Sequence, residues 1–196
     1  MGTTTRAALW ASALLALALV VALLWWTAAE RGLTARDLWE TVDPPPESCV
    51  EQDPTTSGCL TPTALRLHDA AVARFGAPGA DAPIRSVTCW SAHAWNPSSD
   101  HPEGRACDFF PGRYGEFPEG DDLAAGWAVA HWLRENAGEL DVRYVIWQGR
   151  IWSAGSSDAG DGWGRPYTGG GVYDPEDATG GHFDHVHVSV RDGSRW

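Results

Sequence analysis

The sequence contains no lysine, so all 14 of its basic residues are arginines. Schiff-base chemistry and general-base catalysis by a lysine amine are therefore excluded. Acidic residues number 26, which gives a formal net charge of −12 at pH 7. Nucleic acids and anionic lipid headgroups are bound by basic surfaces, so this charge argues against both partners. At 196 residues, the chain is long enough for one well-buried domain with appendages.

Only one long apolar run occurs, and it lies near the N-terminus. Residues 7–26, AALWASALLALALVVALLWW, follow Arg6 and contain Ser12 as their only polar residue. A helix of about 20 residues spans roughly 30 Å, the thickness of a bilayer core, and a Trp pair suits its interface. We favour an uncleaved signal anchor over residues 1–29, against a signal peptide cut near Ala29. Residues 30–196 then lie outside the cytoplasm, on a single-pass cell-membrane protein or on a secreted one.

Cysteine is scarce, with four residues and no CxxC pair, which disfavours cysteine-ligated zinc. An even number of cysteines in an oxidising compartment predicts disulfides. We expect the pairs nearest in sequence, Cys49–Cys59 and Cys89–Cys107. Each would stabilise the fold by about 2–3 kcal/mol.

The order of the predicted elements indicates the fold class. Residues 30–60 are rich in Pro, Ser, Thr and acids toward their end and predict an extracytoplasmic stalk, followed by a domain over residues 61–196. Apolar spacing predicts two helices, at 61–76 and about 122–137, and strands at 84–90, 105–110, 143–147, 150–153 and 183–190. Strands without regular helical crossovers predict an α+β fold with a mainly antiparallel central sheet and flanking helices.

A segment of low apolar content separates the last two predicted strands. Residues 154–181 hold nine glycines and no apolar period. Loops of this length inside a domain are uncommon and tend to be functional or disordered. Two hypotheses stay open, a lid that shapes a substrate site and a disordered insertion.

Two segments carry metal-binding residue types. Side chains alternate along a strand, so His185 and His187 of "DHVHV" project to the same side. A catalytic zinc ion takes three nitrogen or oxygen ligands and keeps one open position. The segment "SSDHPEGRACDFF" supplies His101 and Asp108. Two neighbouring strands could therefore present His101, Asp108 and one histidine of the pair to one zinc ion per chain.

The first segment also completes a known pattern. Ser-x-His-x-x-Gly-x-Ala-x-Asp is present as Ser99, His101, Gly104, Ala106 and Asp108. It resembles the zinc signature of peptidoglycan peptidases that include D-alanyl-D-alanine carboxypeptidases and L-alanyl-D-glutamate endopeptidases. Those enzymes share a fold with lysostaphin-type endopeptidases and the Hedgehog signalling domain. The wider sequence is also similar to secreted actinobacterial domains related to these peptidases.

The resemblance implies roles for individual residues. His101, Asp108 and His187 would be the zinc ligands, and the motif acidic-x-x-His would make Asp184 the catalytic base. On a straight strand Asp184 would point away from His187, which would make His185 the better base, so both alternatives stay open. A disulfide from Cys107 would brace the site.

One feature of the family is missing. Relatives carry an arginine shortly before the Ser-x-His motif to stabilise the transition state, and none is nearer here than Arg85. Either Arg85, Arg105 or His93 would substitute, or the hydrolytic power would be reduced; Ser99 would give support within the motif. The expectation is a membrane-tethered zinc metallopeptidase that acts on the peptidoglycan stem peptide. The alternative is a metal-binding surface module with little or no activity.

Overall fold

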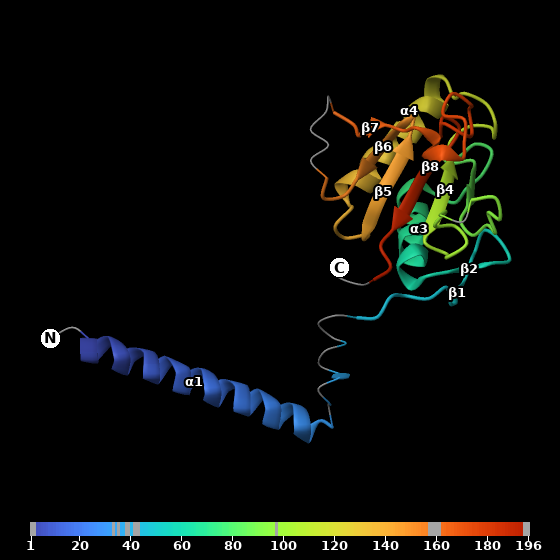
Figure 1. The fold of residues 1–196 in the computed structure, drawn as a ribbon. Coiled ribbons are helices and arrows are strands. Elements are labelled where there is room, and N and C mark those ends of the chain that lie inside the picture. Colours follow the sequence, from blue (N-terminus) through green and yellow to red (C-terminus); the bar gives the residue numbers. More distant parts are fainter. Residues whose placement is uncertain are drawn as a thin grey trace. The chain divides into compact units, whose positions relative to one another are not determined.

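The structure is a computed structural model that describes residues 3–32, 34, 36–37, 40, 44–96, 98–156 and 162–193. The chain divides into two compact units, one of residues 1–45 with 195–196 and one of residues 46–194 (Figure 1). Parts of several predicted segments lie outside the described residues: the N-terminal segment at 1–2, the stalk at 33, 35, 38–39 and 41–43, the glycine-rich segment at 157–161, and the rest of the domain at 97 and 194–196.

The N-terminal unit contains the predicted apolar helix. Helix α1 spans Thr3–Glu30, and its stretch Ala13–Glu30 has a mean hydropathy of 2.0. Large apolar side chains along it, Trp25 and Trp26 among them, are exposed. The helix is long and apolar enough to cross a membrane, a property that a signal sequence shares.

The second unit is built on an antiparallel sheet. Its strands are β3 (Ser86–Thr88), β4 (Ala106–Phe110), β5 (Val142–Trp147), β6 (Arg150–Ser153), β7 (Arg165–Pro166) and β8 (Val186–Val190). Their order is β3-β4-β8-β5-β6-β7, so β4 and β8 are central neighbours although about 75 residues of chain separate them. The β5–β6 hairpin turns at Gln148 and Gly149, both with positive φ. The α+β class with antiparallel pairing is confirmed.

Two helices pack on one face of this sheet. Helix α3 spans Pro62–Phe75, and the Thr61 side chain caps it by accepting from the Ala64 N–H at 3.2 Å. Helix α4 spans Gly120–Glu135. Their buried apolar residues join one core with alternate residues of the central strands: Cys107, Phe109, Val145, Trp147, Val186, Val188 and Val190. The intervening residues of the same strands face the opposite side of the sheet.

The predicted disulfides are both present, Cys49–Cys59 and Cys89–Cys107. The first closes a loop that holds the short strand β1 (Glu51–Gln52) and ends at the first residue of its partner β2 (Cys59–Leu60). The Asp53 side chain in this loop accepts from the Trp90 N–H at 2.9 Å. Residues 46–60, expected in the stalk, therefore pack as part of the compact unit.

Candidate metal centre and cleft

Strand pairing brings two of the predicted ligands together on the face opposite the helices. Asp108 of β4 and His187 of β8 are direct partners in the antiparallel register. His101 lies in the turn before β4, where Gly104 N–H donates to the His101 carbonyl at 3.0 Å. The two segments that are distant in sequence therefore meet at one point of the sheet.

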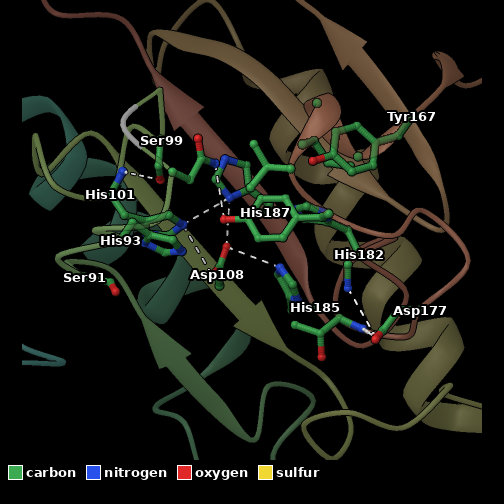
Figure 2. Close-up of a pocket in the computed structure, with 18 of the residues that line it drawn as sticks. Ser91, His93, Ser99, His101, Asp108, Tyr167, Asp177, His182, His185 and His187 are labelled. Carbon is green, nitrogen blue, oxygen red and sulfur yellow. Dashed lines mark hydrogen bonds and ion pairs between the residues drawn. The ribbon is translucent and has the colours of Figure 1, made fainter.

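The three predicted ligands form a compact triangle of donor atoms (Figure 2). His101 Nε2 lies 3.2 Å from His187 Nδ1 and 3.3 Å from Asp108 Oδ2. His187 Nδ1 lies 2.9 Å from Asp108 Oδ1. Both histidines are buried, and the Asp108 side chain is 15% exposed. These residues could hold a metal ion.

The geometry suits a small tetrahedral ion. Ligand atoms about 2.0–2.1 Å from zinc at tetrahedral angles lie roughly 3.3 Å from one another, close to the separations found here. The second nitrogen of each histidine is also held: His101 Nδ1 donates to the Cys89 carbonyl, and His187 Nε2 shares a hydrogen bond with Ser189 Oγ at 3.0 Å. Such bonds fix the tautomer that directs the other nitrogen to a metal. The donor set thus fits zinc, while other ions that favour nitrogen and oxygen ligands also match it.

Charge within the triangle is balanced by protons in the absence of an ion. Burial alone raises the pKa of Asp108, but the neighbouring His101 and His185 hold it well below its usual value. Burial alone lowers the pKa of His101, but the Asp108 carboxylate raises it to about 9. Because a metal needs the deprotonated imidazole, binding of an ion displaces this proton.

His185 and Asp184 form a pair beside the triangle. Strand β8 begins at Val186, so neither residue follows the regular strand alternation. Asp184 is fully buried; its Oδ1 accepts from His185 Nδ1 at 2.5 Å, and its Oδ2 accepts from the Gly115 N–H at 2.6 Å and Thr179 Oγ1 at 2.8 Å. The other nitrogen of His185, Nε2, lies 3.6 Å from Asp108 Oδ1. Asp184 thus fixes the His185 ring through Nδ1, while Nε2 of the same ring faces the triangle.

The predicted supporting residues divide into two groups. Ser99 and His93 line the cleft; Ser99 Oγ accepts from the His101 N–H at 3.3 Å, and the His93 ring stacks on His101 at 4.9 Å. Two arginines lie elsewhere. Arg105 pairs with Asp100 at 3.0 Å, and Arg85 bonds Asp122 at 2.8 Å. Neither arginine is among the described residues that line the cleft.

A cleft of about 840 Å³ opens over the triangle. One wall comes from the glycine-rich segment, which includes β7 and a 3-10 turn at Gly169–Gly171. Tyr173 of this wall accepts from Asn96 Nδ2 at 3.2 Å and so joins the opposite wall. Sequence analysis missed several ring-bearing residues that line the cleft, among them Tyr144, Tyr167 and His182. Tyr144 stacks on His187, with ring centroids 5.5 Å apart.

Comparison with known families gives one match. A family model described as "VldE, C-terminal domain" matches residues 56–179, more than half of the chain. The match includes His101 and Asp108 and ends before His187. Comparison with curated proteins and with solved structures finds no match. The matched share of the chain is large enough to assign the family: the chain belongs to the VldE C-terminal domain family.

Proposed function

We propose that the unit of residues 46–194 is a zinc-dependent peptidase-like domain that hydrolyses amide bonds of cell-wall peptides outside the cytoplasm. The observation that carries the proposal is the donor triangle at the base of a large cleft, with His185 beside it. The resemblance of the Ser-x-His-x-x-Gly-x-Ala-x-Asp pattern to peptidoglycan peptidases supports the stem peptide as substrate. Helix α1 would anchor the domain in the cell membrane. If the helix is cleaved off as a signal sequence, the domain would be secreted.

His101, Asp108 and His187 would hold the ion and leave a coordination position toward the cleft. When bound there, zinc would lower the pKa of a water molecule toward about 7 and polarise the scissile carbonyl. Proton transfer and positioning would be carried out by side chains of this chain.

His185 is the better placed of the two expected bases. Its Nε2 would accept a proton from water as the water oxygen bonds to the carbonyl carbon. The same proton would pass to the amide nitrogen as the C–N bond breaks, which leaves a carboxylic acid and an amine. Asp184 is a positioning residue in this scheme, because both of its oxygens are occupied by protein donors and one holds His185 Nδ1.

The test is peptide release from purified peptidoglycan by the full chain in detergent, with zinc measured by emission spectrometry. His185→Ala should abolish release, and Asp184→Asn should slow it by at least about 10²-fold, while both keep one zinc per chain. His131→Gln, an exposed site on α4, is the control and should match the wild type. Full activity of His185→Ala would refute the assignment of the base.

A different result would identify the alternative function. If the wild-type chain binds one zinc ion and releases no peptide, the domain is a metal-binding surface module. The cleft's described lining contains no arginine, which is the observation that favours this alternative.

A further inference from the structure

His182 occupies a fixed place in the cleft, beside the proposed base. Its side chain is buried, with 8% of the residue exposed, and lines the cleft. The ring lies 4.6 Å from the His185 ring and 5.5 Å from the His187 ring, and the Tyr167 ring meets it edge-on at 4.8 Å. Figure 2 shows His93 beside His101, with His185 and His182 on the other side of Asp108.

The backbone of residue 182 is held firmly. Its N–H donates to the Thr179 carbonyl at 3.1 Å, and its carbonyl accepts from the Gln148 N–H at 2.9 Å. The φ of His182 is +56°, in the left-handed region that side-chain-bearing residues seldom adopt. These features aim one particular side chain into the cleft at a cost in local strain.

The His182 ring interacts with the Gly180 backbone, but one of its nitrogens is left without a partner in the described part of the chain. Its Nδ1 is buried without a hydrogen-bond partner among the described residues. Leaving a buried polar atom unpaired is unfavourable, so this nitrogen of a cleft-lining ring is available for a bond with a ligand.

Amide hydrolysis is accelerated by a hydrogen-bond donor at the carbonyl oxygen. The carbonyl oxygen gains negative charge as water adds, and N–H groups already aimed at that position stabilise it. The chain has no lysine, and no arginine is among the described residues that line the cleft. An imidazole carries at least one N–H in either protonation state, so it can serve as the donor.

We propose that His182 donates a hydrogen bond to the carbonyl oxygen of the scissile amide and takes the part that an arginine plays in the related peptidases. This assignment rests on the proposed function. It makes His182 a catalytic residue that belongs to neither sequence motif.

The experiment measures binding of an alanyl-alanine phosphinate, whose tetrahedral oxygens carry the charge that the carbonyl oxygen gains. The full chain in detergent is loaded with Co²⁺, and its visible spectrum reports both the ion and the phosphinate. His182→Gly removes the ring and suits the positive φ. It should leave the Co²⁺ spectrum unchanged and weaken phosphinate binding at least tenfold, whereas His182→Gln, which keeps an N–H donor, should restore part of the affinity. His131→Gln is the control.

Three outcomes would overturn the inference. They are wild-type phosphinate affinity in His182→Gly, loss of Co²⁺ from that variant, or no phosphinate binding by the Co²⁺-loaded wild type. Peptide release, measured in parallel, separates the two proposals. If the wild type releases peptide and His182→Gly releases it at the same rate, only the role of His182 is refuted. If the wild type releases no peptide, the proposed function is refuted.

Discussion

Gly104, in the turn between His101 and Asp108, should be among the least replaceable residues of the domain. Its φ is +66°, which costs an alanine about 1–2 kcal/mol. A Cβ atom there would also lie 2.4 Å from Cys49 Sγ, 2.6 Å from the Cys59 carbonyl oxygen and 2.9 Å from Leu60 Cα. Two of these neighbours are backbone atoms of β2, so relief requires a shift of the strand, at about 1–3 kcal/mol. Gly104→Ala should therefore lower the free energy of unfolding by about 2–5 kcal/mol.

Gly115→Ala is the matched control for this prediction. Gly115 also has a positive φ, +76°, but a Cβ atom there would meet nothing within 4 Å. Gly115→Ala should lower the free energy of unfolding only by the cost of the positive φ, about 1–2 kcal/mol. The assay is urea unfolding of the metal-free full chain in detergent, followed by tryptophan fluorescence. Equal losses for the two variants would refute the crowding argument, and a loss below about 1 kcal/mol for Gly104→Ala would refute both parts of it.

Three further predictions concern the disulfide, an acidic residue and the metal. Replacing Cys89 and Cys107 together by alanine should lower the free energy of unfolding by about 3 kcal/mol, measured by urea unfolding, and weaken zinc binding, measured by titration. Asp53 has a pKa below 3.8, because hydrogen bonds from threonine side chains and backbone N–H groups outweigh its burial. Wild type should therefore melt higher than Asp53→Asn above about pH 4, and the difference should vanish as the pH falls through the lowered pKa; a difference independent of pH would contradict this. A chelator should lower the melting temperature of the zinc-loaded wild type but not of His187→Ala, and equal shifts would argue against this ion site.

Local patterns in the sequence were enough to predict most elements. Thr61 and Gly76 bound α3 as capping rules predict, and β6 has the predicted ends. Within β4 and β8 the side chains alternate as regular strands require, with core residues on one face and the ligands Asp108 and His187 on the other. The disulfide pairs followed from proximity in sequence.

Features that depend on irregular backbone were beyond such patterns. Strand β8 was expected from residue 183 but begins at Val186, so alternation could not show which way Asp184 and His185 point. The positive φ that turns His182 into the cleft has no sequence signature, because only a few per cent of non-glycine residues adopt that conformation. Ion pairs also hold the two arginines outside the cleft lining: Arg105 pairs with nearby Asp100, and Arg85 pairs with Asp122, which is distant in sequence.

The direct pairing of Asp108 with His187 has a consequence for how the sheet assembles. If β8 slid by one residue against β4, His187 would turn toward the helices and Val188 would take its place beside the carboxylate. Only one alignment of the two strands therefore assembles all three donors. Metal supplied during refolding would stabilise that alignment alone. The ion would therefore select the correct strand register as well as form part of the finished site.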